Sequence, residues 1–452
     1  MTIGQLARVT GAQILRGNKN ARIHHVVFRS IRDASPHSAF FVIGSRGQQN
    51  ILPALQGIGS ACVIVPPWMR QWVPTHHALL IIHNPKIALW RLVRWQRNQS
   101  RAVFVAITGS AGKTTTKEMI ASIAQQKYPT LKTYKNNNLV GSLPDHVFRL
   151  NPATRVAVLE MSPPHINFHC AYARPKIGIV TTIGEAHIGK HGSLANLVRA
   201  KQQLIDGIQP GGYVLLNVDD PGSRRLSTKG FRGKVIRYGF HPSADFRATR
   251  VRFTDRGMHF HVRHTPYFIP TWGQHNVSNA LAAIAAGHLL KIPVPLIQQG
   301  LRNFQVPSMR LQRLAGIRNY TLINDAYNAN PTAAIAGLKV LKQMARNRPS
   351  VAVIGDMLEL GSHTISGHTR VGAAVAKYKL THLITVGRKA SIVARVAARR
   401  GMPSSRIHLF MHPHSVASHI PRLIPPGAYI YFKASRGMKF EGIVRQLRSP
   451  SG

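Results

Sequence analysis

A glycine-rich turn between an apolar run and a polar helical pattern is the segment with the clearest chemistry. The apolar run Val103–Ile107 is followed by two glycines, a lysine and three threonines. Glycines let backbone N–H groups approach a phosphate, and a helix amino end adds positive potential. The segment predicts a nucleoside-triphosphate site in which Lys113 reaches the β- and γ-phosphates and Thr114 coordinates Mg²⁺. The expected nucleotide-binding residues here are Thr108, Gly109, Ser110, Ala111, Gly112, Lys113, Thr114 and Thr115.

The spacing of this turn is shorter than the usual phosphate loop. The strict pattern has a glycine five residues before the second glycine, where this chain has Ile107. An ordinary glycine-rich turn is therefore the alternative. The flanking strand and helix patterns favour the phosphate loop.

Three further side chains that could take part in phosphate or metal chemistry lie in the same part of the chain, two of them at or after the end of an apolar strand. Glu160 ends the run Val156–Glu160, His187 follows the run 177–183, and Lys201 lies on the helical pattern after it. Ligands gather at the carboxyl ends of strands in open α/β sheets. Glu160 is therefore a candidate magnesium ligand, although it could also pair with a lysine. From composition alone, His187 would be structural and Lys201 an exposed cation.

Acidic residues are scarce, which makes their placement informative. The chain has 60 Lys and Arg against 14 Asp and Glu, a formal charge of +46. Such a charge could attract nucleic acid, nucleotides or an anionic membrane surface, so a nucleotide-dependent polyanion-binding protein is one alternative. The basic residues are diffuse, however, and no nucleic-acid-binding signature accompanies them, so no specific nucleic-acid partner is expected.

The order of apolar and helical patterns predicts an α/β protein with three domains. Short strand-like runs and one helix fill residues 1–98, a strand–helix alternation around the phosphate loop fills 99–308, and the alternation restarts in 309–452. The segment from about 236 to 267 alternates and predicts antiparallel strands. We expect a small mixed N-terminal domain, a central ATPase-like sheet and a C-terminal Rossmann-like domain.

Targeting signals and metal-type cysteine spacing are not evident in the sequence. Cys62 and Cys170 lie far apart, which fits a reducing compartment, and no apolar run is long enough for a signal peptide or a membrane span. We expect a cytoplasmic protein, monomeric, with peripheral association with an anionic membrane left open.

Taken in order, the motifs resemble the Mur ligase family of peptidoglycan synthesis. The segments that carry the resemblance are the phosphate loop, Val158–Met161, Thr182–His187, Ala200–Lys201, Gly273–Ala280, Asn324–Pro331, Gly355–Gly361 and Lys433–Met438. The resemblance covers about residues 26 to 447. It implies a UDP-substrate-binding domain, a central ATPase and a C-terminal domain that closes on the nucleotide and the incoming amine.

The resemblance also implies roles for individual residues. Glu160 and His187 match magnesium ligands, and Lys201 matches a lysine that becomes a carbamate and helps to hold a second Mg²⁺. Asn276 matches an adenine contact, and Arg310 and Asp325 match nucleotide contacts. Lys113, Lys201 and His187 are the expected catalytic residues. The expected substrate contacts are Arg32, Asn328, Asp356, Ser435 and Arg436.

The implied reaction is the ATP-dependent joining of a carboxylate to an amine through an acyl phosphate. The implied substrates are a UDP-muramoyl tripeptide and D-alanyl-D-alanine, and the implied cofactors are ATP and two Mg²⁺ ions. The chain departs from the family pattern at Ser30–Arg32 and Ser162–His165. A related ligase with another carboxylate and amine therefore stays open, and Asp356 and Asn328 could simply cap a helix or form a turn.

Overall fold

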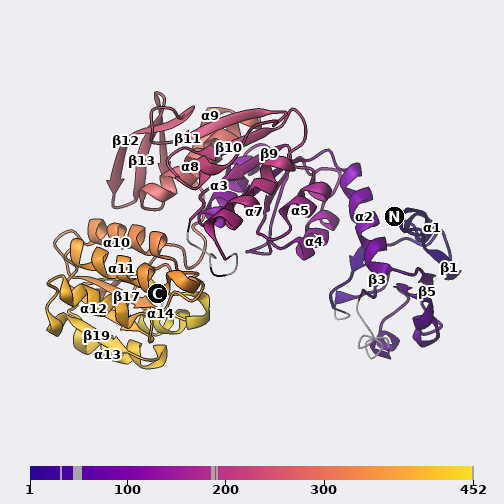
Figure 1. Cartoon of the computed structure of the whole chain (residues 1–452). Helices are drawn as coiled ribbons and strands as arrows, with labels where there is room; N and C mark the ends of the chain where they lie inside the picture. The colour runs from indigo at the N-terminus through magenta and orange to yellow at the C-terminus, as the bar shows by residue number, and fades with distance from the viewer. Residues whose placement is uncertain (31–32, 44–52, 185–188, 190–191, 450–452) are drawn as a thin grey trace. The chain divides into compact units, whose positions relative to one another are not determined.

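The computed structural model describes residues 1–30, 33–43, 53–184, 189 and 192–449. The described chain forms three sheets with helices around them, so the α/β class is confirmed (Figure 1). Two compact units are present: the first is Met1–Ala102 with Leu139–Arg155 and Ala171–Ala173, and the second is the remainder. The predicted domain boundaries near residues 98 and 308 stay predictions. None of the described helices has the length and apolar content needed to cross a bilayer.

The first unit contains a five-stranded sheet in the order β1-β5-β4-β3-β2. Strands β2 to β5 are parallel and β1 is antiparallel to β5. Every residue of β4 is buried, as its continuous apolar run predicts. The strands are β1 (Gln13–Arg16), β2 (His25–Val27), β3 (Ser38–Phe41), β4 (Cys62–Val65) and β5 (Ala78–Ile81), and the first two helices are α1 (Ile3–Thr10) and α2 (Pro85–Gln99).

A later segment of the chain completes this first unit. Helix α4 (Leu143–Phe148) packs against α2, and the Phe148 ring meets the Phe28 ring edge-on at 6.5 Å between centroids. Arg29 forms an ion pair with Asp145 at 2.8 Å. The linear boundary at residue 98 could not anticipate this contribution, because it comes from sequence that lies beyond the phosphate loop.

The second unit contains a nine-stranded sheet that carries the phosphate loop, in the order β14-β13-β12-β11-β10-β9-β6-β8-β7. Strands β7, β8, β6 and β9 are all parallel, so Thr108, Glu160 and Val180 end at the same edge. The strands are β6 (Val103–Thr108), β7 (Thr130–Lys132), β8 (Val156–Glu160), β9 (Ile177–Val180), β10 (Tyr213–Asn217), β11 (Lys234–Gly239), β12 (Phe246–Thr254), β13 (Gly257–Val262) and β14 (Thr265–Ile269).

The prediction of antiparallel strands from about residue 236 was partly wrong. Strands β12, β13 and β14 are antiparallel to one another, but β11 runs parallel to both β10 and β12. Alternation of apolar and polar residues reports one exposed face of a sheet, and it does not distinguish the strand direction.

The helices of this sheet confirm the predicted alternation. The alanine-rich α8 and the phosphate-loop helix α3 are packed against each other and share one apolar core with β6, β8 and β9. The helices are α3 (Lys113–Gln125), α5 (Ile166–Ala173), α7 (Leu194–Asp206), α8 (Gln274–Leu289) and α9 (Val294–Arg302).

The third sheet has the order β15-β16-β20-β17-β18-β19 and is parallel except at β15. The strand–helix alternation predicted for residues 309–452 is confirmed. The strands are β15 (Gln312–Ala315), β16 (Thr321–Asn324), β17 (Ser350–Gly355), β18 (His382–Val386), β19 (Ile407–Phe410) and β20 (Tyr429–Lys433). The helices are α10 (Pro331–Ala345), α11 (Thr364–Lys377), α12 (Ser391–Arg399), α13 (Val416–Leu423) and α14 (Glu441–Leu447).

The close approach of α9 to α3 generates a stability prediction. A Cβ on Gly300 would lie 2.5 Å from the Ile123 Cα, a backbone atom that cannot move aside. We expect Gly300→Ala to destabilise the protein by about 1–3 kcal/mol, the usual cost of overpacking. Gly442→Ala is the matched control, because nothing lies within 4 Å of its Cβ position in α14. Thermal unfolding measures both, and equal midpoints for the two variants would contradict this packing.

Candidate active site

The phosphate loop has a backbone that only glycine can adopt at two positions. Gly109 and Gly112 have φ values of +154° and +83°, and a Cβ would lie 1.9 Å from Thr181 Oγ1 and 2.4 Å from Asn279 Oδ1, respectively. Gly112 precedes α3, and no described side chain caps this amino end. The loop thus brings the uncapped first turn of α3 to the sheet edge, which is the arrangement that binds phosphates.

Lys113 starts α3 and turns its ammonium back over the loop. Its Nζ donates to the Gly109 carbonyl at 2.7 Å, so the side chain lies along the turn that would hold the phosphates. Burial lowers the pKa of Lys113, while the Glu160 carboxylate opposes that shift. A phosphate arriving at the loop would supply the anionic partner that favours the charged amine.

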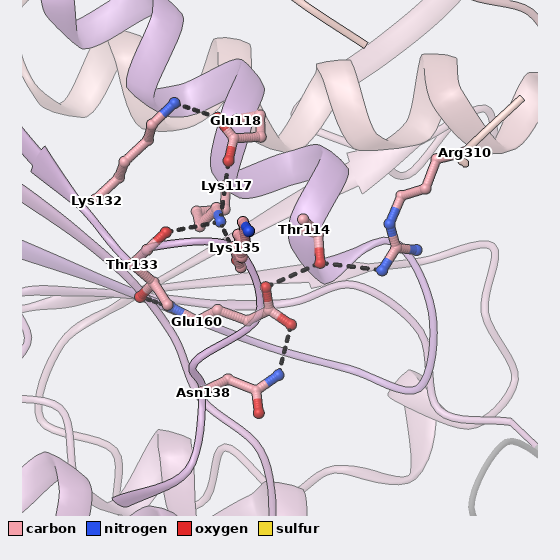
Figure 2. A network of polar contacts seen from close by, with 9 residues as sticks. All are labelled: Thr114, Lys117, Glu118, Lys132, Thr133, Lys135, Asn138, Glu160 and Arg310. Carbon is pink, nitrogen blue, oxygen red and sulfur yellow. Dashed lines mark hydrogen bonds and ion pairs between the residues drawn. The ribbon is translucent and has the colours of Figure 1, made fainter. Parts of the chain in front are cut away.

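Thr114 and Glu160 form the centre of the site (Figure 2). The Thr114 hydroxyl donates to Glu160 Oε2 at 2.9 Å, and Asn138 Nδ2 donates to Glu160 Oε1 at 2.8 Å. Arg310 Nη2 donates to the Thr114 hydroxyl at 3.1 Å. Glu160 is only 2% exposed, and these contacts orient both of its carboxylate oxygens.

Arg310 and Asp325 are held by separate groups within the second unit. The Arg310 guanidinium lies over the Tyr327 ring, 4.5 Å from its centroid. Asp325 Oδ2 accepts from Lys433 Nζ at 2.5 Å and from the Tyr431 hydroxyl at 3.0 Å. Asp325 Oδ1 accepts from the Leu311 backbone N–H at 3.2 Å, which fixes the chain directly after Arg310.

Asn276 is buried at the start of α8. Its Nδ2 donates to Trp272 O at 2.8 Å and to Thr271 Oγ1 at 3.2 Å, and its Oδ1 accepts from Asn279 Nδ2 at 3.1 Å. Both amide hydrogens are thus engaged within the protein. Asn279 in turn accepts from the Thr116 hydroxyl at 3.2 Å and lies against Gly112, so this chain of amides supports the phosphate loop.

Lys201 is a buried cation on α7. Its side chain is 1% exposed and makes no hydrogen bond or ion pair to the part of the chain that the structure describes. Burial lowers its pKa well below the ordinary value, and repulsion from Lys113 adds to this shift, whereas the Asp220 carboxylate opposes it. A larger fraction of the amine is therefore neutral at a given pH than for an exposed lysine.

Comparisons with known proteins agree with this site. Residues 107–287 match the Mur ligase middle domain, and residues 309–436 match the family described as Mur ligase, glutamate ligase domain. A Bacillus subtilis protein named UDP-N-acetylmuramoyl-tripeptide–D-alanyl-D-alanine ligase is 30% identical over 99% of this chain and 98% of its own length. The chain belongs to the Mur ligase family. It is an ATP-dependent ligase that forms a C–N bond.

Two further relatives support the assignment to this family. An Escherichia coli protein with the same name is 31% identical over 82% of each chain. The crystal structure of MurF from Acinetobacter baumannii aligns with a TM-score of 0.85 and 26% identity over 99% of this chain and 98% of that chain. The resemblance to Mur ligases predicted from the motifs is therefore confirmed.

The structure of this Mur ligase brings together only part of the predicted set. Four predicted residues lie together at the phosphate loop: Lys113, Thr114, Glu160 and Arg310. Arg32 and His187 fall outside the described residues. Within the described residues no group of three or more His, Cys, Asp or Glu side chains could hold a metal ion. The metal-ligand roles of Glu160, His187 and Lys201 remain predictions.

The predicted substrate contacts have local structural partners. Asp356 Oδ1 accepts from the Ala390 N–H at 2.7 Å, next to the start of α12, and Ser435 Oγ accepts from the Leu358 N–H at 2.9 Å. Asn328 Oδ1 accepts from the Ala329 N–H at 2.8 Å, and Arg436 pairs with Glu441 at 3.0 Å. The substrate roles of these four residues stay predictions.

Sequence reasoning missed two asparagines that support the centre of the site. Asn138 bonds to Glu160, and Asn279 lies against Gly112. The run of three asparagines, Asn136–Asn138, was the available signal for the first. Asn279 lies inside the segment Gly273–Ala280, but the resemblance implies no role for it.

The bond from Asn138 to Glu160 generates a prediction about turnover. We expect Asn138→Ala to lower kcat/KM by about 10- to 100-fold, the scale of lost groups that orient metal ligands. Asn136→Ala is the control, because Asn136 is exposed on the same turn. Steady-state kinetics with the purified variants measures the effect. Equal losses in both variants would mean that the turn, rather than the bond to Glu160, matters.

Proposed function

We propose that this Mur ligase joins D-alanyl-D-alanine to the peptide carboxylate of a UDP-N-acetylmuramoyl tripeptide, with hydrolysis of ATP to ADP and phosphate. The observation that carries this proposal is the similarity to relatives of that name across almost the whole chain, including the N-terminal unit. The phosphate loop and the Thr114–Glu160 pair supply the nucleotide end of the reaction. Both substrates are small molecules, and ATP and UDP-linked precursors make the cytoplasm the proposed compartment.

The oxygen atoms at the centre of the site fit Mg²⁺. Thr114 Oγ1 and Glu160 Oε2 are 2.9 Å apart at the phosphate loop, and hard oxygen donors with room for phosphate oxygens are what this ion prefers. Thr114, Glu160 and His187 would hold it, and a carbamate on Lys201 would help to hold a second ion. Bound Mg²⁺ would neutralise the triphosphate so that an anionic carboxylate can approach.

Different residues of this chain would act in the two chemical steps, which are phosphorylation of the carboxylate and attack of the amine on the acyl phosphate. Lys113, at the phosphate loop, would balance the charge that develops on the γ-phosphoryl group as the substrate carboxylate attacks it. The amine of D-alanyl-D-alanine would attack the resulting acyl phosphate, and phosphate would leave. Arg310 and Asp325, joined to the site through Thr114 and Leu311, would contact the nucleotide.

Substrate recognition is proposed for residues outside this centre. Arg32 would contact the uridine nucleotide, and Asn328, Asp356, Ser435 and Arg436 would line the site of the peptide and the amine. Ser162–His165 departs from the family pattern after Glu160, which is why another carboxylate and amine pair is the competing proposal. The test below separates the two.

The proposed reaction predicts phosphate release that depends on both substrates. With ATP and Mg²⁺, release should require UDP-muramoyl tripeptide and D-alanyl-D-alanine together, and mass spectrometry should find the product heavier by the dipeptide. Lys113→Ala should lower turnover by about 10²–10³-fold or more, the scale of a lost charge-stabilising group. Lys127→Ala is the control, because Lys127 follows the carboxyl end of α3 and makes an exposed contact with the Lys291 carbonyl.

Two results would contradict these proposals in different ways. No product from wild-type enzyme that binds ATP would reject the substrate pair and favour a ligase for other substrates. Nearly full activity of Lys113→Ala would remove the phosphate loop from the mechanism. Phosphate release stimulated by DNA in place of the tripeptide would instead support a polyanion-binding protein.

The burial of Lys201 predicts a carbamate that can be detected directly. Only a neutral amine adds CO₂, and the lowered pKa raises the neutral fraction at a given pH. After equilibration with ¹³C-bicarbonate, we expect a carbamate resonance in the wild type that weakens as pH falls. Lys201→Arg should lack this resonance and lose turnover. The same resonance in Lys201→Arg would assign the signal to another amine.

A further inference from the structure

A completely buried lysine lies on α3, one turn after Thr114, and the mechanism above does not use it. The Lys117 side chain is 0% exposed. Its Nζ donates to Thr133 O at 2.8 Å and to Lys135 O at 2.6 Å, and it pairs with Glu118 Oε1 at 3.0 Å. An ammonium has three N–H donors, so the group is fully engaged.

The positive charge of Lys117 is balanced by the Glu118 carboxylate. Glu118 also pairs with Lys132, so it lies between two ammonium groups (Figure 2). Burial opposes ionisation of Glu118, but the bond from Lys132 and the contacts with Lys117 outweigh it and lower its pKa. A buried charge is costly unless it is paired and hydrogen-bonded, and this arrangement meets both conditions.

The two carbonyls that Lys117 holds belong to the segment that holds Glu160. The Thr133 hydroxyl accepts from the Glu160 backbone N–H at 3.0 Å, and its own N–H donates to Val158 O at 3.0 Å. Three residues after Lys135, Asn138 donates to the Glu160 carboxylate. The segment 133–138 therefore bonds both the backbone and the side chain of Glu160.

We propose that Lys117 is a positioning residue for Glu160, acting through the segment 133–138. This inference rests on the proposed function, in which Glu160 is an oxygen ligand of Mg²⁺. Lys117 and Thr114 lie on the same helix, three positions apart. One rigid helix thus presents the Thr114 hydroxyl directly and sets the orientation of Glu160 through Lys117. The relative placement of the two oxygen groups is then fixed before the cation arrives.

The first test replaces the ammonium while keeping the length of the side chain. Lys117→Met should raise the Mg²⁺ concentration for half-maximal turnover and lower kcat by about 10- to 100-fold, the scale of lost orienting groups. The KM for D-alanyl-D-alanine should stay near the wild-type value. Lys132→Met is the matched control: the Lys132 side chain is 41% exposed, and an exposed ion pair contributes little. That variant should behave as the wild type.

A double-mutant cycle tests whether Lys117 acts through Asn138. If both act on Glu160 by one route, Lys117→Met with Asn138→Ala should be little worse than the more damaging single change. Independent effects would multiply, and a multiplied loss would overturn the proposal. If Lys117→Met does not fold, Thr133→Val still tests whether the segment 133–138 positions Glu160, because it removes only the acceptor of the Glu160 N–H and leaves the carbonyl that Lys117 contacts. It should also be less than additive with Asn138→Ala.

A binding measurement separates positioning from general stability. Calorimetric titration of ADP at several Mg²⁺ concentrations should show that Lys117→Met shifts the Mg²⁺ dependence of binding, while thermal unfolding reports stability. A lower unfolding midpoint with wild-type Mg²⁺ dependence would reject the positioning role. If the wild type makes no pentapeptide product, the proposed function fails, but this binding readout still decides the role of Lys117.

Discussion

The hydrogen bond between Thr114 and Glu160 is the contact around which the second unit is arranged. It joins the first turn of α3 to the carboxyl end of β8, and it exists because β6 and β8 are parallel neighbours. The glycines of the loop let α3 begin within reach of that strand end. Arg310 adds a third group from a distant part of the chain. The site thus depends on the order of the strands, because the loop and the first turn of α3 supply Lys113 and Thr114 whereas Glu160 and Arg310 come from other segments.

The few carboxylates of this basic chain are used where charge or direction has to be controlled. Thr114 and Asn138 orient Glu160 by hydrogen bonds. Glu118 forms ion pairs with Lys117 and Lys132. Asp325 accepts hydrogen bonds from Lys433 and Tyr431. Buried cations without such partners are costly, so a chain with +46 formal charge has little freedom to bury lysine. Lys201 is therefore distinctive, because no described ion pair or hydrogen bond accompanies its burial, only the nearby charge of Asp220 favours its ammonium, and carbamate formation would change the sign of its charge.

Several features were predictable because they are local in the sequence. The strand, turn and helix around residues 103–125 follow one another, so their pattern predicted the phosphate loop and its context. The fold class and most strands of the second and third sheets followed from alternating apolar runs and helical patterns. The direction of β11 and the transfer of 139–155 to the first unit did not, because strand direction and partner choice depend on which surfaces meet.

The sequence by itself determined the kind of chemistry: glycines, Lys113 and Thr114 in one turn specify a phosphate site, and the order of motifs specifies the ligase family. Only the tertiary structure decided how Glu160 is held and why Lys117 is buried. Asn138 and Glu160 are 22 positions apart, and Thr114 and Arg310 are 196 positions apart. A contiguous motif can report the backbone shape it needs, because neighbouring residues create that shape. Hydrogen bonds between distant segments depend on strand order and packing, which no short stretch of sequence contains.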